Sequence, residues 1–479
     1  MDNVTFIIVF GLYLIGITGF GIWVSRKHKS GEDFLLAGRS LGAFLLMGTT
    51  IATCIGTGST MGAVGTGYNN GWLGAVYGLA VGIGLIATAI FFADSREKRF
   101  VTMSEEVAFY YGGNKSMKSV VGVLVFLASV GWLGGHIVGG GMYLSWATGI
   151  DLTTAKIITA IGFGLFTVIG GYVAVVWTDT IMAFVLFFGF LIMAGVSVYL
   201  VGGISPLEEV AGGRILSFGI DNMGWGAFLA IIVASSISII ATPSIRQRIY
   251  SGKDTKTIKK SFIVSGIVCA MFAFIPAIVG VSASILIPDL DKANFAFPQM
   301  AATILTPAVG LLVVIAGLSA TMSSASSDAM AGTSILVRDL YPVLTKGKQA
   351  PSDLVVKISR FSLVITIVTA LLFSITANDV LSYLTKMLST ITTGLAIAII
   401  LGRFWPRATW QGGLASIFGG SLTSLAVMTF PTLSNAVGHP AVPALVMAIL
   451  CGVIVSLSTR REDFDPEEVL MQLKEERTI

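Results

Sequence analysis

A run of small polar residues, SATMSSASSDAM at 319–330, has the composition of a cation-binding segment. Helical spacing gathers its polar residues together: Ala320, Ser323, Ser324 and Ser327 share one face, and Ser326 and Asp328 lie beside it. A hard monovalent cation such as sodium prefers hydroxyl, carbonyl and carboxylate oxygens. Because a helix that loses its regular bonding at Ala320 also frees a carbonyl, the run predicts a sodium site that includes Ala320, Ser323 and Ser324.

A glycine-rich segment, TIATCIGTGSTMGAVGTGYNNG at 50–71, can supply the missing ligands. Its polar residues occupy the middle of an apolar stretch and not one stripe along it: they are Thr53, Thr57, Ser59 and Thr60. This arrangement favours a helix broken halfway, whose freed carbonyls around Ala52 and Ile55 face a cavity. The alternative is that the small residues only allow close helix packing, and that the serines bond to their own helix.

A second acidic residue, Asp179, lies in the apolar segment GGYVAVVWTDTIMAFVLFFG. An acid within a membrane is costly and is by default a candidate for function. It could instead be a helix N-terminal acid that the helix dipole favours.

The composition indicates that these segments belong to a membrane protein. Of the 479 residues, 54% are hydrophobic and only 12% are charged, with a mean hydropathy of +0.86. Soluble globular chains carry about a quarter charged residues, so this chain is expected to cover its surface with a lipid bilayer. The net charge of +4 is too small to indicate binding to nucleic acid.

Thirteen apolar segments are long enough to span a bilayer, which takes about 20 residues. They are 4–25, 41–67, 72–93, 117–146, 153–174, 177–202, 224–246, 261–287, 305–330, 354–376, 380–402, 410–430 and 441–458. Alternate connections concentrate Lys and Arg, as in RKHK, SREKRF, RQRIYSGKDTKTIKK and TRRE, whereas the others hold few cations, among them Lys156. The positive-inside rule therefore predicts an N-terminus outside and a C-terminus in the cytoplasm.

The order of the spans predicts an internal repeat. Five spans from the broken segment onward, 41–202, precede five more, 224–402, which enter from the opposite side and open with another polar-centred segment, ASSISIIATPS. Inverted repeats of this kind are typical of secondary transporters. The remaining divisions are a first span with its loop, an outer loop, two additional spans and a tail: 1–40, 203–223, 403–458 and 459–479. The tail is expected to be a solvated amphipathic helix without a role.

Several motifs together resemble the sodium/solute symporter family, whose members carry proline, pantothenate, galactose, sialic acid or choline. They are DFLLAGRS, GGYVAVVWTD, RQR, SATMSSASSD and VRDLY, and the resemblance covers almost the whole chain. It implies an all-α, LeuT-like fold of five plus five helices in an inverted repeat. It also implies a main sodium site formed by carbonyls of Ala52, Ile55 and Ala320 with the hydroxyls of Ser323 and Ser324. A further sodium site would use Asp179, Ser326 and Ser327, so that two ions are expected.

Within that fold the solute is expected at mid-membrane, against the broken helix and its neighbours. The candidate substrate-binding residues are Thr57, Gly58, Ser59, Thr60, Tyr77, Trp132, His136, Ser235, Ser238 and Thr242. Trp132 and Tyr77 could equally be packing aromatics, and His136 reads as a hydrogen-bonded core residue rather than a proton relay.

Departures from other members narrow the solute class. Gly58 and Ser59 stand where the galactose carrier presents polar partners, so a sugar is disfavoured. Cys54 and Thr242 stand where the choline carrier has tryptophans, so a cation–π cage is incomplete. Because positive helix ends suit carboxylates, a small organic acid or amino acid is the favoured solute.

Other classes of membrane protein fit less well. A channel would show a filter or a charged ring, and an enzyme would need a metal or nucleophile cluster, which three histidines do not suggest. A proton-coupled symporter and a transporter-like sensor remain the alternatives. The sequence leaves the oligomeric state open.

Overall fold

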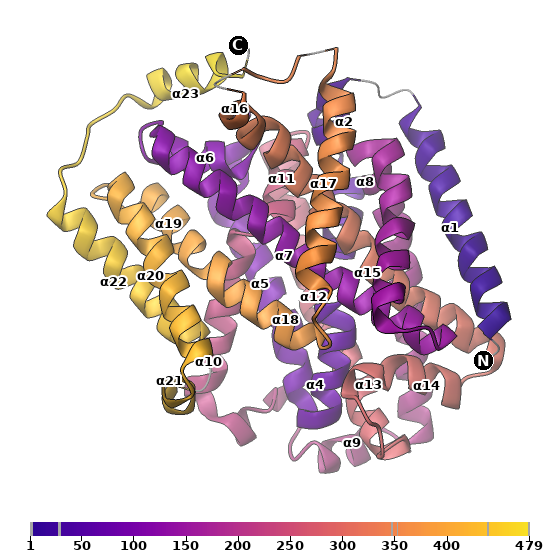
Figure 1. Cartoon of the computed structure of the whole chain (residues 1–479). Helices are drawn as coiled ribbons and strands as arrows, with labels where there is room; N and C mark the ends of the chain where they lie inside the picture. Colours follow the sequence, from indigo (N-terminus) through magenta and orange to yellow (C-terminus); the bar gives the residue numbers. More distant parts are fainter. Residues whose placement is uncertain (1–2, 27–29, 346–347, 352, 438–439, 478–479) are drawn as a thin grey trace.

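The computed structural model describes residues 3–26, 30–345, 348–351, 353–437 and 440–477. Every regular element in these ranges is helical (Figure 1). Residues 27–29 of the predicted cationic connection RKHK, and residues 346–347 of a further one, VRDLYPVLTKGKQ, lie outside the described ranges. The fold class is therefore all-α, as the sequence predicts.

The helices follow one another along the chain with short connections. The earlier ones are α1 (Asn3–Ser25), α2 (Gly31–Leu36), α3 (Ala43–Cys54), α4 (Ala63–Asn70), α5 (Val76–Phe92), α6 (Met103–Tyr110), α7 (Lys115–Thr148), α8 (Leu152–Leu200), α9 (Ile204–Val210), α10 (Ile220–Ile240) and α11 (Pro243–Ser251). The later ones are α12 (Thr255–Phe272), α13 (Phe274–Leu286), α14 (Ala296–Ile304), α15 (Pro307–Ile335), α16 (Tyr341–Leu344), α17 (Val355–Ser374), α18 (Val380–Met387), α19 (Thr393–Phe404), α20 (Trp410–Thr429), α21 (Pro431–Val437), α22 (Ala441–Ser458) and α23 (Pro466–Glu475).

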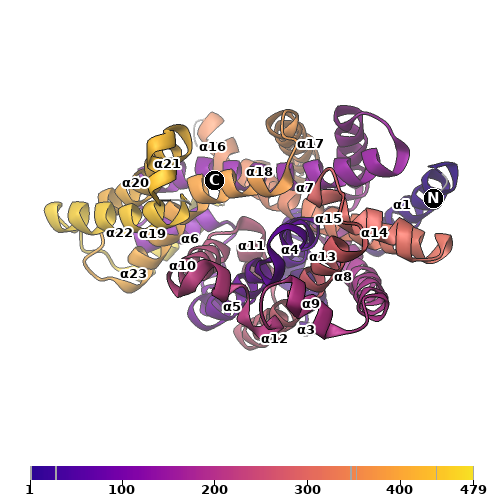
Figure 2. The ribbon, with the colours of Figure 1, turned by 90° about the horizontal axis from the view of Figure 1, so that it is seen from below.

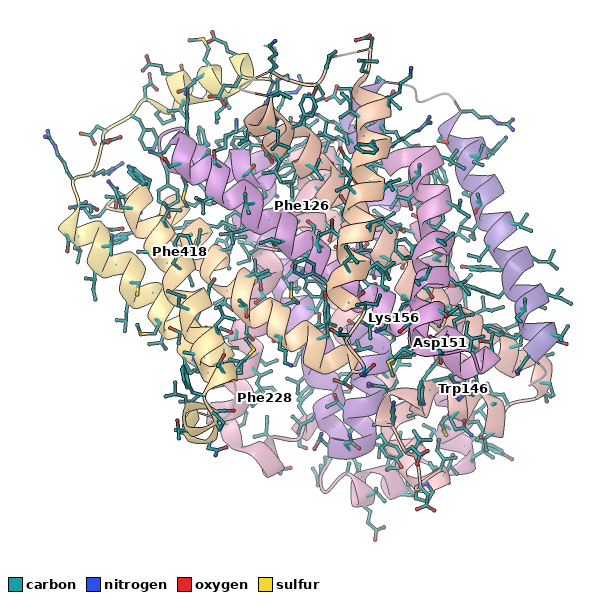
Figure 3. All side chains as sticks on the ribbon, viewed as in Figure 1. Phe126, Trp146, Asp151, Lys156, Phe228 and Phe418 are labelled. Atoms are coloured by element: carbon teal, nitrogen blue, oxygen red, sulfur yellow. The ribbon has the colours of Figure 1, made fainter. Side chains whose placement is uncertain are left out.

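The helices form one elongated bundle, with α1 at one edge and α20 and α22 at the opposite edge (Figure 2). We call the end that carries α2, α16 and α23, at the top of Figure 1, the tail end. Large apolar side chains cover the outer faces; Phe418 on α20, for example, is 49% exposed (Figure 3). An outer surface of this kind suits lipid and not water.

Nine helices in the described ranges are long and apolar enough to cross a membrane, or ten if the bent pair α10–α11 counts as one span. Several of the thirteen predicted spans are interrupted, and two of them, 153–174 and 177–202, form the single helix α8; together these features explain the lower number. The predicted span 41–67 is divided between α3 and α4, and 380–402 between α18 and α19. Interrupted helices expose backbone groups, which must find partners inside the protein.

The predicted boundary between 153–174 and 177–202 is displaced in the structure. Both segments lie in α8, which is broken instead at Gly171, where φ is 62° and ψ is −159°. Glycine alone adopts this conformation readily, and a Cβ at Gly171 would lie 2.6 Å from the ring of Phe34. The break thus forms where the backbone of α8 lies against the ring of Phe34 on α2.

Lys156 lies in the first turns of α8 and not in an exposed connection (Figure 3). Its Nζ donates to the carbonyls of Ser374, Ile375 and Ala377 at distances of 2.9, 3.0 and 2.5 Å. Because the last carbonyls of a helix lack internal partners and carry partial negative charge, the ammonium group caps the C-terminal end of α17.

The C-terminal tail is not merely solvated. Val469 and Leu473 of α23 are buried at 5% and 0% exposure, and α23 contacts α6. Arg477 pairs with Glu105 at 2.6 Å, and Lys118 pairs with Glu476 at 2.6 Å. The amphipathic pattern was read correctly, but its apolar face covers protein, so the tail is docked.

Helix α15 lies in the interior of the bundle. Every residue from Val313 to Ile335 is buried, and the helix contacts α3, α7 and α8. A lipid-facing helix would expose one side. The serines and the aspartate of 319–330 therefore face protein on all sides, where each needs a partner.

Candidate ion and solute site

The broken helix provides free carbonyls at the position that the sequence predicts. Helix α3 ends at Cys54, Ile55 follows with the non-helical angles φ −93° and ψ 59°, and helical bonding resumes at Gly58. In a continuous helix, the carbonyls of Ala52 and Thr53 would accept hydrogen bonds from backbone N–H groups of the next turn. They accept hydrogen bonds from α15 instead.

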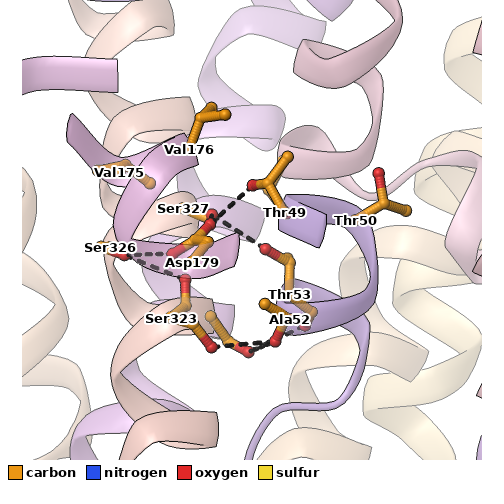
Figure 4. A network of polar contacts seen from close by, with 12 residues as sticks. Thr49, Thr50, Ala52, Thr53, Val175, Val176, Asp179, Ser323, Ser326 and Ser327 are labelled. Carbon is orange, nitrogen blue, oxygen red and sulfur yellow. Dashed lines mark hydrogen bonds between the residues drawn. The ribbon is translucent and has the colours of Figure 1, made fainter. Parts of the chain in front are cut away.

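Ser323 and Ser324 meet these carbonyls in a cluster that is rich in acceptors (Figure 4). Ser323 Oγ lies 3.0 Å from the Ala52 carbonyl oxygen and 3.2 Å from that of Ala320. Ser324 Oγ lies 3.3, 2.9 and 3.1 Å from the carbonyl oxygens of Ala52, Thr53 and Ala320. Each hydroxyl has one proton to donate, so the oxygens outnumber the donors. Convergent oxygens with few protons form a suitable shell for a monovalent cation.

Four of the five residues predicted for the main sodium site are thus brought together: Ala52, Ala320, Ser323 and Ser324. Ile55 is buried beside them, but no hydrogen bond among the described residues joins its carbonyl to Ser323 or Ser324. Thr53, which the ligand set did not include, contributes its carbonyl oxygen to the cluster.

Asp179 lies one turn of α15 further toward the tail end, in a second polar cluster (Figure 4). Thr49 Oγ1 and Ser327 Oγ each donate to Asp179 Oδ2 at 2.8 Å, and Ser326 Oγ lies 3.4 Å from Oδ1. Asp179 is fully buried. The three residues predicted for a second sodium site therefore do meet.

A residue that the sequence reasoning did not assign, Arg248, enters this second cluster. Its Nη2 lies 3.4 Å from Asp179 Oδ2 and 2.7 Å from Ser327 Oγ. The same nitrogen donates to Thr49 Oγ1 at 2.6 Å and to Thr53 Oγ1. A guanidinium group therefore already interacts with the oxygens predicted to bind sodium.

The positions of Arg246 and Arg248 show that one part of the predicted topology is wrong. The sequence counted them in an exposed cationic connection, but both are fully buried in α11. Their charges are compensated inside the protein: Arg248 by Asp179, and Arg246 by Glu106 at 3.2 Å. The sequence contains these arginines in the RQR motif, but only the packing of α11 against α15 shows that they are buried beside acidic partners.

Six of the ten predicted substrate residues line one small central cavity of about 30 Å³: Gly58, Ser59, Tyr77, Trp132, His136 and Thr242. Ser235 and Ser238 line a larger neighbouring cavity, which shares Gly58, Tyr77 and Trp132 with the central one. Thr57 and Thr60 line neither cavity. Thr60 bonds to the Gly56 carbonyl at 2.9 Å, and Thr57 Oγ1 lies 2.8 Å from His136 Nδ1. These two hydroxyls therefore hold the break in shape.

Asp328 is a cavity residue that the sequence reasoning left unassigned. It lines the central cavity, and its Oδ2 lies 3.3 Å from His136 Nε2, with both side chains buried. The Nε1 of Trp132, on the same cavity, has no hydrogen-bond partner among the described residues. The cavity thus offers a carboxylate acceptor and an unused indole donor.

The ion cluster and the central cavity adjoin each other at Gly56. A Cβ added there would lie 2.3 Å from Ser324 Oγ and 2.8 Å from His136 Cε1. Only a residue without a side chain allows α15 and α7 to approach the break this closely. A shift of Ser324 at the ion cluster can therefore move the wall of the cavity through the backbone of Gly56 alone.

Comparison with known proteins agrees with this arrangement. A family model described as "Sodium:solute symporter family" matches residues 34–420. A sodium/pantothenate symporter of Haemophilus influenzae is 27% identical over 94% of this chain and 96% of its own length. The osmoregulated proline transporter OpuE of Bacillus subtilis is 23% identical over 96% of each chain. A sodium/glucose cotransporter of Vibrio parahaemolyticus is 24% identical over 97% of this chain and 92% of its own.

Among solved structures, a Na⁺-coupled sialic acid symporter in a substrate-bound outward-open state is similar in fold. It has a TM-score of 0.82 at 17% identity and covers 97% of this chain and 98% of its own. These relatives are transporters, and this chain is likewise a transporter and not an enzyme. The matching model covers far more than half of the residues, so the chain belongs to the sodium:solute symporter family.

Proposed function

We propose that this protein carries a small amino acid or organic acid into the cell together with sodium. The observation that carries the proposal is the contact at Gly56 between an oxygen-rich cluster and the central cavity, which borders a larger cavity of about 670 Å³ with room for a solute. Sodium bound by Ala52, Ile55, Ala320, Ser323 and Ser324 would hold α3 against α15 and thereby shape the cavity. Coupling follows because solute and ion then stabilise the same arrangement of the broken helix.

Within this solute class, a zwitterionic amino acid matches the cavity best. Asp328 can accept hydrogen bonds from an ammonium group, and the unpartnered Trp132 Nε1 can donate to a carboxylate. An organic acid without a nitrogen would have to lie near a buried carboxylate, which costs free energy unless His136 is protonated. Gly58, Ser59, Tyr77, Ser235, Ser238 and Thr242 would provide the remaining walls.

The transport cycle that we propose rests on thirteen spans, of which 41–202 and 224–402 form an inverted repeat. Two interrupted helices support it: α3–α4 opens the first set, and α10–α11 opens the second with a bend of 48°. Interrupted helices at matching positions are the expected location of the site in such repeats. The tail end would face the cytoplasm, with the N-terminus outside and the C-terminus inside.

A second sodium ion at Asp179, Ser326 and Ser327 is part of the proposal, with one condition. Arg248 Nη2 and a sodium ion would compete for Ser327 Oγ and Asp179 Oδ2. Sodium can therefore bind there only when Arg248 withdraws.

The test is thermal unfolding of the purified full chain with a panel of amino acids, organic acids and sugars, with and without sodium. We expect a stabilising amino acid whose effect requires sodium and is lost in its N-acetyl derivative. The Ser323→Ala/Ser324→Ala variant should still fold. The amino acid should no longer stabilise it, whether or not sodium is present. If the double variant responds to sodium as the wild type does, the ion assignment is wrong. If only sugars stabilise, the solute class is wrong.

A further inference from the structure

A cationic cavity of about 480 Å³ opens at the tail end, away from the ion and solute site. Most of its charged lining is basic: Arg39, Arg99, Arg338, Lys474 and Arg477 face a single acid, Glu32. These residues come from four separate parts of the chain, namely the α2 region, the segment before α6, the π-helical segment Leu336–Leu340 that follows α15, and α23 with the residues just after it. The cavity therefore forms only when α23 is docked.

Two of the four arginines that line this cavity, Arg99 and Arg338, have no acid partner among the described residues. Arg39 pairs with Glu32 at 2.6 Å, and Arg477 pairs with Glu105 at 2.6 Å. No hydrogen bond or ion pair joins the side chain of Arg99 or Arg338 to another residue in the described ranges. Moreover, Arg338 Nε and Arg477 Nη2 are buried without a hydrogen-bond partner there. Buried donors of charged groups are costly to leave unsatisfied, so a missing acceptor is expected.

The backbone angles and the local electrostatics of the cavity also indicate that positive charge is held there at a cost. Arg39 and Arg99 adopt positive φ angles of 54° and 56°, which cost an ordinary residue roughly 1–2 kcal/mol. Burial lowers the pKa of the Arg39 guanidinium; Glu32 raises it, and Arg477 and Arg96 lower it further. Positive charge is therefore concentrated here at some cost in free energy.

The positive-inside rule alone does not account for this arrangement. That rule concerns orientation, and cations that are free to remain on the surface satisfy it. Arg39 is only 7% exposed, and Arg338 and Arg477 are partly buried. Guanidinium groups that converge in this way match the geometry of a phosphate, whose oxygens accept paired N–H groups.

We propose that this cavity binds a polyvalent oxyanion of the phosphate class, which joins α23 to the end of α15. Because α15 carries the ion cluster, an anion held between α23 and Arg338 would restrain the tail end and slow its opening. The ligand is either the phosphate of a lipid headgroup or a soluble polyphosphate, and both share this chemistry. The inference does not depend on the identity of the transported solute.

The experiment measures thermal unfolding of the full chain in detergent while sodium tripolyphosphate is titrated at constant sodium concentration and ionic strength. We expect saturable stabilisation of the wild type and at least a tenfold weaker apparent affinity for Arg99→Gln/Arg338→Gln. Because neither side chain has a partner, the double variant should unfold at or above the wild-type temperature without the anion. Lys259→Gln removes an exposed cation near the same end and should behave as the wild type does.

Two further arms identify the source of the phosphate. In nanodiscs, phosphatidic acid should stabilise the wild type more than the variant if a lipid headgroup is the ligand. If the ligand is soluble, tripolyphosphate should stabilise the wild type in neutral phosphatidylcholine discs as much as it does in detergent. Equal stabilisation by sodium sulfate at matched ionic strength, or an unchanged affinity in the double variant, would overturn the proposal.

Discussion

Arg248 is the residue that most alters the chemistry of the ion site. It brings a permanent positive charge to 3.4 Å from Asp179 Oδ2, in a cluster that would otherwise consist of a carboxylate and hydroxyls. A buried carboxylate without a cation is strongly unfavourable, and sodium or a guanidinium group can each serve as that cation. If the proposed second sodium ion binds there, the cluster has two alternative occupants, and their exchange would accompany a movement of α11.

This exchange predicts the response of sodium binding to two substitutions. Equilibrium binding of radioactive sodium to the wild type should be cooperative if a second ion binds at Asp179. Asp179→Asn should give a simple hyperbola, because the carboxylate that attracts the second ion is gone. Arg248→Gln should lower the half-saturating sodium concentration several-fold, because the competing cation is removed.

Lys259→Gln serves as the control for the loss of one positive charge, since Lys259 is exposed. A hyperbolic wild-type curve that neither substitution changes would mean that only the site at Ser323 and Ser324 binds sodium.

At the scale of helices, the site depends on interruptions. The break between α3 and α4 frees the carbonyls of Ala52 and Thr53, and the break in α8 at Gly171 accommodates α2. Helix ends inside the bundle require partners of the same kind. Lys156 provides them for α17 by donating to the carbonyl of its last residue, Ser374, and to the carbonyls of Ile375 and Ala377 just beyond it.

Lys156 therefore contributes to stability rather than to topology. Lys156→Met keeps the length of the side chain but removes the donor, so three carbonyls at the end of α17 lose their partner. Hydrogen bonds to charged groups contribute about 1.5–3 kcal/mol, and we expect a loss of that order in the free energy of unfolding. Thermal unfolding in detergent measures it, with Lys292→Met, an exposed cation, as the control. An unchanged unfolding temperature would show that water replaces the ammonium group.

At the scale of the whole molecule, the bundle presents apolar side chains outward and keeps its polar network in the interior. Helix α15 is the clearest case, because its polar segment is buried along its full length. Ion and solute must therefore reach the site through movements of the surrounding helices. With the proposed stoichiometry, transport would draw on the membrane potential as well as on the sodium gradient.

Net charge movement gives the prediction at this scale. Two sodium ions entering with a zwitterion move positive charge inward, and each charge that crosses 100 mV releases about 2.3 kcal/mol. In proteoliposomes with equal pH on both sides, an imposed sodium gradient should drive accumulation, and a negative interior should increase it. Accumulation driven by a pH gradient without sodium would instead identify a proton-coupled carrier.

The amino-acid sequence by itself determined the class of the molecule and indicated most residues of the proposed ion cluster. Apolar length, helical period and the glycine-rich interruption are local properties, so they indicate membrane helices, a serine face on 319–330 and a break near Ile55 without any knowledge of packing. Tertiary structure decided which charges meet. Arg248 and Asp179 are 69 residues apart, and Thr57 and His136 are 79 apart. Contacts of this kind depend on how helices pack, which is why a loop cation became the partner of a buried acid, and why Asp328 and the docked tail acquired roles that local patterns do not encode.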